Sequence, residues 1–466
     1  MATPSRPARI QRTPEWGIDP VPPEQRVLGL LDQAALWGNL GISLLVLVAG
    51  ALLVPALGLW PALAATLLGA VIGNALLGLA AVPAAETGVP TMVLYRAALG
   101  VRGSLLPTAC NVVQNLGWAV FELFVMAQAA TVVSERVLGF RGRLLWVLLF
   151  GAITTALTLA GPLKVIRRWL ERFAIWAVLA STAYLTWYAL TRFDLGALAG
   201  RPGQGGLSFW AGVDIAVALP VSWVPLVADY ARFGRSARAT FWGTGIGYFL
   251  AQVWFYALGI VFLLGIGQGD VIAAVVAVPA GLLAMAVLVV DEADEVFANL
   301  YSTGVSIQNA VPRLPGRRLA LALGVGATCL AALVDDLARY ESFLFLLGAL
   351  FVPLFGVLAA DYFVLARRRY DVAGMYRPDG PYRGVRWPAV LVWLLGFLAY
   401  NWINPGAEGT WVSLNRALFA GLLHLPFPLS ARYPWLGASL PTFAVAFLAM
   451  LATGRSPHPG PGAARG

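Results

Sequence analysis

The chain has 466 residues, of which 59% are hydrophobic and only 12% are charged. Soluble domains average about 45–50% apolar and about 25% charged residues. The composition therefore excludes a soluble enzyme, and it excludes a disordered chain because disordered chains are poor in apolar residues. The formal net charge of +9 does not indicate a nucleic-acid partner, because the basic residues are spread over short segments between apolar runs. We expect the lipid bilayer to be the main partner.

Apolar runs of roughly 20 residues, the length that crosses a bilayer as a helix, repeat along the chain. They predict twelve spans, at residues 30–56, 61–83, 104–133, 143–161, 168–191, 209–231, 241–267, 276–309, 318–334, 341–365, 388–404 and 435–452. We therefore expect an all-α polytopic membrane protein. Its predicted parts are a cytoplasmic N-terminal tail (1–26), a single transmembrane transporter domain (27–454) and a disordered C-terminal tail (455–466).

The distribution of basic residues predicts the orientation. With a cytoplasmic N-terminus and alternating spans, 24 of the 32 basic residues fall on the cytoplasmic side and 8 on the other. Membrane proteins keep an excess of Lys and Arg in cytoplasmic loops. We therefore expect a multi-pass protein of the cell membrane, plasma or inner, with both termini cytoplasmic. The loop with Arg136, Arg141 and Arg143 is the exception, because it falls outside.

Span 1 contains Trp37-Gly38-Asn39-Leu40-Gly41, the first break in the apolar pattern. Two glycines around an amide favour local unwinding, which exposes backbone carbonyls to a cation. The alternative is close packing of helices through small residues.

Span 3 carries Asn111, Asn115, Trp118 and Glu122 at spacings i, i+4, i+7 and i+11. This spacing places all four on one helix face. Such a stripe suits a flat heteroaromatic ring, because an indole stacks on the ring while an amide and a carboxylate bind its edge. The alternative is hydrogen bonding between helices.

Span 6 contains Pro220 and Pro225, each of which removes a backbone donor and kinks a helix. Non-helical backbone at membrane depth is tolerated where it lines a cavity. We therefore expect an interruption that holds Ser222 and Trp223.

Span 8 carries the strongest signal, four carboxylates within five residues: Asp291, Glu292, Asp294 and Glu295. Carboxylates this close repel one another unless protons or cations are present. One alternative is an aqueous end of the span, where the charges are merely solvated. However, the apolar residues 276–290 extend only about 23 Å as a helix, too short to cross alone. Mid-membrane placement is therefore favoured.

Interrupted spans 1 and 6 lie five apart, as do the polar spans 3 and 8. A five-plus-five inverted repeat produces this offset, with substrate bound at the midplane between the repeats. The pattern indicates a secondary transporter. A phosphate-binding loop is absent from the sequence, which disfavours ATP-driven transport.

The only histidines, His424 and His458, lie in a late loop and the tail, so zinc chemistry and a Ser-His-Asp triad have no support, and we expect no enzyme.

Five short segments carry a family likeness: Trp16-Gly17-Ile18-Asp19-Pro20-Val21-Pro22-Pro23-Glu24-Gln25-Arg26, Trp37-Gly38-Asn39, Gly117-Trp118, Pro220-x-Ser222-Trp223-x-Pro225-Leu226-x-x-Asp229-Tyr230-x-Arg232 and Asn299-Leu300-Tyr301-Ser302. In this order they resemble the purine–cytosine permeases of the nucleobase–cation symporter-1 family, over about residues 15–400. The resemblance implies a leucine-transporter-like fold that moves nucleobases or related heterocycles with sodium or protons.

The resemblance also implies two sets of site residues. Trp118 would stack on the ring, within a substrate set of Asn115, Trp118, Glu122, Leu219, Pro220 and Ser222. The cation set would be Gly38, Asp291, Asp294 and Glu295. Sodium-dependent members use hydroxyl and carbonyl oxygens where this chain has carboxylates, which makes protons plausible as the coupling ion.

The sequence thus predicts an importer of a nucleobase, cytosine or a purine, coupled to H⁺ or Na⁺ and using no other cofactor. Glu122 and Asn39 would bind the ring edge, and Ser222, Trp223 and Asn299 would complete the pocket. The alternatives are a transporter of hydroxymethylpyrimidine (a thiamine precursor), allantoin or another small heterocycle or amine. A more distant alternative is an integral-membrane enzyme or a sensor.

Overall fold

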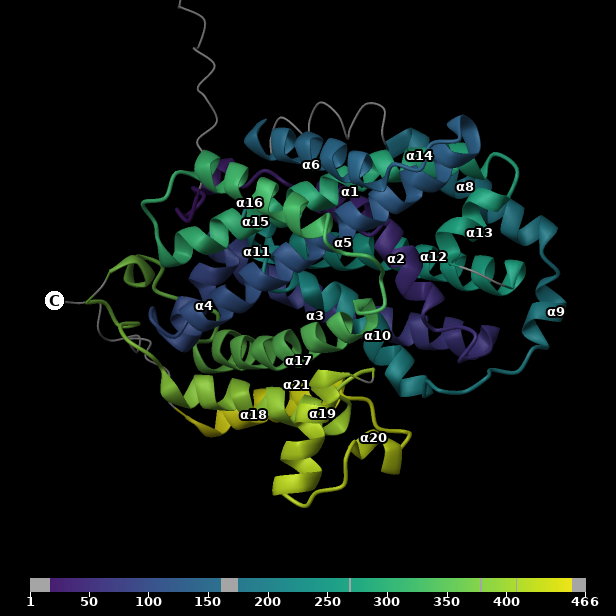
Figure 1. The fold of residues 1–466 in the computed structure, drawn as a ribbon. Helices are drawn as coiled ribbons and strands as arrows, with labels where there is room; N and C mark the ends of the chain where they lie inside the picture. The colour runs from purple at the N-terminus through teal and green to yellow at the C-terminus, as the bar shows by residue number, and fades with distance from the viewer. Residues whose placement is uncertain (1–16, 161–174, 268–269, 378, 408, 455–466) are drawn as a thin grey trace, which may run out of the picture.

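The computed structural model describes residues 17–160, 175–267, 270–377, 379–407 and 409–454. All of their regular structure is helical (Figure 1), apart from an isolated bridge between Leu28 and Gly234. The predicted C-terminal tail, the first sixteen residues of the predicted N-terminal tail and the loop after the fourth predicted span lie outside these ranges.

The α-helices fall within or close to the predicted spans and the segments between them. They are α1 (Leu30–Leu40), α2 (Leu44–Ala51), α3 (Leu59–Thr87), α4 (Thr91–Leu99), α5 (Leu105–Leu138), α6 (Arg143–Ala160), α8 (Ile175–Arg192), α9 (Leu195–Ala199), α10 (Phe209–Trp223), α11 (Val227–Ala231), α12 (Ala237–Ile266), α13 (Val271–Ala277), α14 (Gly281–Asp291), α15 (Ala293–Ala310), α16 (Gly316–Ala331), α17 (Tyr340–Ala359), α18 (Trp387–Ile403), α19 (Thr410–Arg416), α20 (Leu429–Arg432) and α21 (Ser439–Ala452). The shorter 3-10 and π segments are η1 (Pro23–Gln25), η3 (Ala360–Leu365), η4 (Ala373–Tyr376) and η5 (Ala417–Leu422).

The first helix group contains predicted spans 1, 2, 6 and 7. In it, α12 packs on α1, α2 and α3, and α10 packs on α3. Glycine allows these backbones to approach closely, as small residues do in membrane proteins. A Cβ added at Gly50 would lie 2.4 Å from the carbonyl oxygen of Tyr256, and one at Gly259 would lie 2.0 Å from that of Leu47. Both positions therefore require glycine.

The second helix group contains predicted spans 3, 4, 8 and 9, in which α5, α6, α15 and α16 pack on one another. The contact between α6 and α16 is reciprocal. Gly151 faces Thr328, and Gly324 faces Thr155, each glycine leaving space for the threonine side chain opposite.

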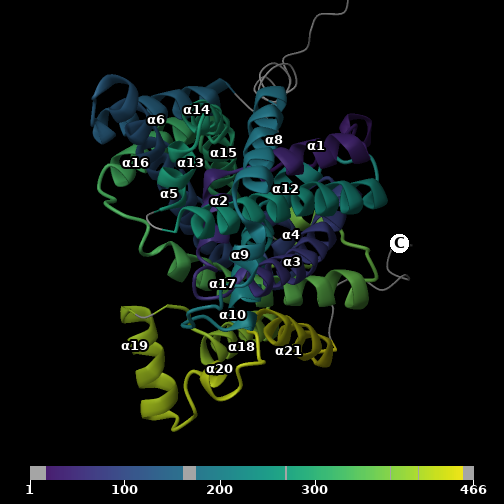
Figure 2. The same ribbon diagram turned by 90° about the vertical axis from the view of Figure 1, so that its right-hand side faces the viewer.

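Each group combines helices that lie five apart in the predicted order, as a five-plus-five repeat requires. The remaining long helices surround the two groups: α8 packs on α14 and α12, while α17 packs on α10, α18 and α21. Figure 1 shows α18 and α21 as a layer beneath α17, and Figure 2 shows the same layer from the side. The arrangement confirms the predicted repeat architecture.

Span 1 is interrupted, as predicted, because α1 and α2 are bent by 63° at the break between them. The position differs from the prediction, since Gly38 and Asn39 lie inside α1 and the break is at residues 41–43. An added Cβ at Gly38 would lie 3.6 Å from the carbonyl oxygen of Gly247. A side chain at Gly38 would therefore make only ordinary contact with α12. The close approach of α1 and α12 is at Gly247, where an added Cβ would lie 2.4 Å from the carbonyl oxygen of Ala34.

Span 6 is also interrupted, between α10 and α11 at residues 224–226. Ser222 and Trp223 lie in the last turn of α10 rather than in the break. Pro220 is accommodated inside α10, and the helix ends just before Pro225. The physical reason is that Pro225 has no backbone N–H, so it cannot donate the next helical hydrogen bond, to the Val221 carbonyl oxygen, and α10 ends at Trp223.

The number of spans stays a prediction. Five of the described helices are long and apolar enough to cross a membrane, and the bent pair of α1 and α2 makes a sixth. The shorter apolar helices α10, α18 and α21 coincide with predicted spans 6, 11 and 12.

The described part of the predicted N-terminal tail packs on the helix ends. Arg232 Nη1 donates to the carbonyl oxygen of Gly17 at 3.0 Å, and the Tyr376 hydroxyl donates to that of Ile18 at 2.6 Å. Arg26 Nη2 donates to the carbonyl oxygen of Thr87, the last residue of α3, at 3.1 Å. Residues 17–26 are therefore held against the helices by buried and half-buried donors.

Candidate functional site

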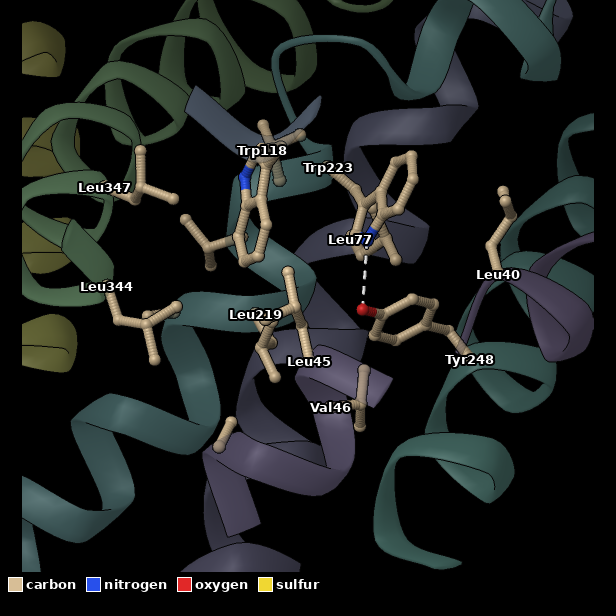
Figure 3. Close-up of a cluster of buried hydrophobic side chains, with 14 of the residues drawn as sticks. Leu40, Leu45, Val46, Leu77, Trp118, Leu219, Trp223, Tyr248, Leu344 and Leu347 are labelled. Carbon is tan, nitrogen blue, oxygen red and sulfur yellow. Dashed lines mark hydrogen bonds between the residues drawn. The ribbon is translucent and has the colours of Figure 1, made fainter. Parts of the chain in front are cut away.

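A narrow cavity lies where the two helix groups meet, with room for about one water molecule. It is enclosed by side chains of α2, α5, α10, α12 and α15 and of the break before α2: Ser43, Leu45, Val46, Trp118, Glu122, Leu219, Trp223, Tyr248 and Glu295. Figure 3 shows Trp118 and Trp223 with Leu45 and Leu219. Five residues predicted from the sequence thus come together: Trp118, Glu122, Leu219, Trp223 and Glu295.

Trp118 is oriented by aromatic side chains of α17. Its indole meets Tyr340 edge-on, with ring centroids 5.9 Å apart, and Phe343 at 5.2 Å. Edge-to-face pairs of this kind are favoured by the ring quadrupoles. The tryptophan is only 6% exposed, so its orientation is determined by packing before any ligand arrives.

Glu122 lies one helical turn beyond Trp118 and is fully buried. Its Oε1 accepts a hydrogen bond of 2.8 Å from Asn299 Nδ2, which also donates to the carbonyl oxygen of Glu295. Glu122 Oε2 is buried without a hydrogen-bond partner among the described residues. Asn299 thus orients Glu122 from α15, and one carboxylate oxygen remains unpaired.

Trp223 forms the other aromatic wall. Its indole nitrogen donates to the Tyr248 hydroxyl at 2.9 Å, a bond drawn in Figure 3. The ring also meets Trp37 edge-on at 5.6 Å. These two contacts fix the indole from α12 and α1.

Five of the nine predicted substrate residues lie outside the cavity wall: Asn39, Asn115, Pro220, Ser222 and Asn299. The Ser222 hydroxyl donates to the carbonyl oxygen of Leu219 at 2.6 Å, so it turns back to its own helix. Pro220 fills the space beside Gly73. Asn115 accepts from Gln114 Nε2 at 3.0 Å, and the same nitrogen donates to the Ser222 carbonyl oxygen. Asn115, Pro220 and Ser222 thus join α5, α3 and α10 behind the wall.

The break before α2 is occupied by a carboxylate. Glu292 accepts from the Ser43 hydroxyl at 2.9 Å and from the backbone nitrogen of Leu44 at 2.7 Å. Leu44 is the first residue of α2. Free N–H groups and the helix dipole make a helix N-terminus a favourable site for an anion. Glu292 therefore joins span 8 to the broken span 1.

The other carboxylates of span 8 point to different partners. Asp294 accepts from Asn39 Nδ2 of α1, and Glu295 faces the cavity with its Oε1 unpaired among the described residues. Asp291 is buried with one unpaired oxygen. Asn39 is thus placed against span 8 and outside the cavity wall, since its amide bonds Asp294.

Glu292, Ser43 and Tyr248 were not assigned to the site by the sequence pattern. A serine before an apolar run is a helix N-cap signal, and Ser43 does accept from the backbone nitrogen of Leu45 at 3.1 Å. That signal could have located the break. Tyr248 lies in an apolar helix, and nothing local in the sequence marks it.

Asp214, which also interrupts an apolar span, has a structural role. Its carboxylate accepts from the backbone nitrogens of Ala438 at 2.7 Å and Ser439 at 2.9 Å. It therefore caps the start of α21 from α10, away from the cavity.

The chain is similar over residues 20–422 to a family described as permeases for cytosine and purines, uracil, thiamine and allantoin. It is 25% identical to the hydantoin permease of Microbacterium maritypicum over 447 residues, which cover 91% of this chain and 89% of the relative. It is 28% identical to the cytosine permease of Escherichia coli (strain K12) over 377 residues, which cover 77% of this chain and 82% of the relative.

Solved structures show the same fold. One is a nucleobase–cation-symport-1 family transporter in a closed conformation with bromovinylhydantoin bound, with a TM-score of 0.75, 22% identity, and coverage of 94% of this chain and 99% of that one. Another is a sodium-coupled sialic acid symporter in an outward-open state, with a TM-score of 0.58, 12% identity, and coverage of 96% and 92%. They confirm the predicted leucine-transporter-like fold. With the family match covering most of its length, the chain belongs to the nucleobase–cation symporter-1 family of permeases.

Proposed function

We propose that this chain is a secondary active transporter, not an enzyme, that imports a nucleobase such as cytosine or a purine. Its transmembrane domain would cover residues 27–454 in twelve spans of the plasma or inner membrane, with both termini cytoplasmic. The observation that carries the proposal is the cavity between the helix groups, which combines two indoles with an oriented carboxylate.

In this proposal Trp118 stacks on the base, and Trp223 with Leu219 closes the opposite side. Glu122, held by Asn299, binds the ring edge. Stacking on an aromatic side chain contributes about 1–3 kcal/mol per base. A single indole therefore contributes a substantial part of the binding free energy of a small ring. Asn115, Ser222 and Pro220 support the wall from behind, and Asn39 acts through span 8.

Transport requires the cavity to widen and to open to each side in turn. In folds built from inverted repeats, one helix group moves against the other around a central site. The cavity here lies at such a boundary, and its walls come from both groups. The breaks in spans 1 and 6 adjoin it, so a change in either break reaches the ligand directly.

We infer that protons are the coupling ion, in preference to sodium. The carboxylates of Glu292 and Asp294 contact span 1 at and before its break, where neutral oxygens would serve a sodium ion. A carboxylate that accepts two hydrogen bonds loses acceptor capacity when it is protonated. Protonation would therefore weaken the contact between spans 8 and 1.

Uptake into proteoliposomes tests the function. Purified protein would be reconstituted and supplied with radiolabelled cytosine or adenine, while proton and sodium gradients are imposed separately. We expect accumulation that depends on a gradient and is lost in protein-free vesicles. Equal uptake in both kinds of vesicle would contradict the proposal.

A second candidate substrate is hydroxymethylpyrimidine, allantoin or a related small heterocycle or amine, because the family description includes thiamine and allantoin. Competition distinguishes the candidates. Unlabelled cytosine, adenine, uracil, allantoin and hydroxymethylpyrimidine would each be added to the uptake assay, and the strongest competitor identifies the class.

A further inference from the structure

The cavity wall offers a ligand hydrogen-bond acceptors in excess of donors. Of the nine residues that line it, two are acidic, and none is Arg, Lys, His, Asn or Gln. Two donors of the wall are engaged, because Ser43 donates to Glu292 and the Trp223 indole donates to Tyr248. The Trp118 indole N–H and the Tyr248 hydroxyl remain as donors, against the four carboxylate oxygens of Glu122 and Glu295. A polar ligand therefore meets more acceptors than donors.

These carboxylates have capacity left. Glu122 is fully buried and Glu295 is 4% exposed, and each has one oxygen without a hydrogen-bond partner among the described residues. A buried acceptor without a partner is costly, and a ligand that donates to it removes the cost. The unpaired oxygens thus indicate a ligand rich in hydrogen-bond donors. This observation is separate from the acidic composition of the wall.

The orientation of Glu122 favours two donors side by side. Asn299 holds Oε1 at 2.8 Å, but each carboxylate oxygen accepts more than one hydrogen bond. Both oxygens therefore remain available to a planar edge that carries two parallel N–H groups. Such paired bonds to a carboxylate are stronger and more specific than single ones.

Resting on the proposed function, we propose that this transporter selects heterocycles with two adjacent N–H donors, a cyclic guanidine or amidinium edge, and that Glu122 binds this edge. Guanine and isocytosine present it through a ring N–H beside an exocyclic amine. Cytosine presents it after taking up a proton on the ring nitrogen beside its amine. Uracil and xanthine place a carbonyl oxygen where the amine would be, and that oxygen would face a carboxylate.

Matched ring pairs test the proposal by direct binding to the full-length protein in nanodiscs, measured as quenching of tryptophan fluorescence. The pairs are isocytosine against uracil and guanine against xanthine, which exchange one amine for a carbonyl. We expect the amine-bearing ring of each pair to bind at least tenfold more tightly. The wild-type comparison needs no variant and is independent of any folding defect.

Variants then assign the preference to Glu122. In Glu122→Gln, whose amide both donates and accepts, we expect the preference for the amine-bearing ring to fall below about threefold. Glu122→Asp keeps a carboxylate, so it should still bind the amine-bearing ring more tightly. Equal affinities within each wild-type pair, an unchanged preference in Glu122→Gln, or equally tight binding of a simple alkylamine would overturn the inference while leaving the proposed transport of a small organic substrate intact. Absence of binding and uptake for every ring would instead contradict the proposed function.

Discussion

Replacing Glu292 tests the contact between spans 8 and 1 most sharply. The carboxylate accepts from the Ser43 hydroxyl and from the Leu44 backbone nitrogen, and both residues are buried at the start of α2. Glu292→Ala removes both acceptors. Glu292→Gln keeps one carbonyl oxygen for Leu44 and adds an amide that can donate to Ser43, but it cannot gain or lose a proton.

The structure gives the size of the stability effect. Leaving the buried N–H of Leu44 without an acceptor costs about 1–3 kcal/mol, and losing a negative charge at the N-terminus of α2 adds about 0.3–1 kcal/mol. Glu292→Ala should therefore lower the free energy of unfolding by about 1–4 kcal/mol. Glu292→Gln retains the hydrogen bond to Leu44 and should lose about 1 kcal/mol or less.

Two assays separate stability from coupling. Thermal unfolding in detergent should rank wild type, Glu292→Gln and Glu292→Ala in falling order, with Ser43→Ala as a matched control that removes one of the two donors. In proteoliposomes, Glu292→Gln should exchange internal for external substrate but lose accumulation under a proton gradient. Wild-type accumulation with unchanged pH dependence in Glu292→Gln would refute the coupling role, and wild-type stability of Glu292→Ala would refute the geometry.

Three further predictions concern the wall, the second carboxylate and helix packing. Trp118→Ala should weaken substrate binding about 5- to 150-fold, the equivalent of about 1–3 kcal/mol of stacking, while leaving membrane expression intact; undiminished uptake in a filter assay would contradict the stacking role. Glu295→Gln should stop or uncouple uptake, and wild-type uptake with unchanged ion dependence would exclude it from coupling. Gly259→Ala should lower thermal stability by about 1–3 kcal/mol through overpacking, because its Cβ would lie 2.0 Å from the Leu47 carbonyl oxygen. Gly304→Ala, which meets nothing within 4 Å, is the control and should leave thermal stability unchanged or raise it by up to about 1 kcal/mol, because alanine is the better helix former.

Much of the architecture could be predicted from the sequence because the bilayer imposes simple rules. Apolar runs of the right length mark helices, and polar breaks five spans apart mark a repeat. The structure confirms both, since each helix group combines elements five apart. The exact positions of the breaks could not be predicted. The sequence predicted unwinding at Gly38, but α1 continues to Leu40 and the break follows at residues 41–43. Local composition does not show which residue of a glycine-containing segment ends the helix.

The candidate site was predictable where spacing along one helix decides which side chains share a face. Trp118 and Glu122 are such a pair, and both line the cavity. Residues that meet only through tertiary packing could not be predicted in the same way. Ser222 is in the expected helix, but its hydroxyl bonds its own backbone. Tyr248 comes from an otherwise apolar helix, so its place in the wall follows from the packing of α12 alone.

The partners of the four carboxylates in span 8 also could not be predicted from the local sequence. The sequence predicted that the four neighbouring carboxylates of span 8 repel one another unless protons or cations are present, and the family resemblance placed Asp291, Asp294 and Glu295 in one cation set. In the structure Glu292 binds the start of α2, Asp294 binds Asn39, and Glu295 faces the cavity. The discontinuity between α14 and α15 at Glu292 contributes to this separation. The three carboxylates therefore make separate contacts, at the start of α2, at Asn39 and at the cavity, rather than forming one shared site.

We propose that a proton gradient drives a nucleobase through this cavity. Uptake of radiolabelled cytosine into proteoliposomes under an imposed proton gradient, an imposed sodium gradient or neither tests this proposal. We expect accumulation with the proton gradient alone, and its loss when a protonophore is added. Accumulation that follows the sodium gradient and persists with the protonophore would contradict it.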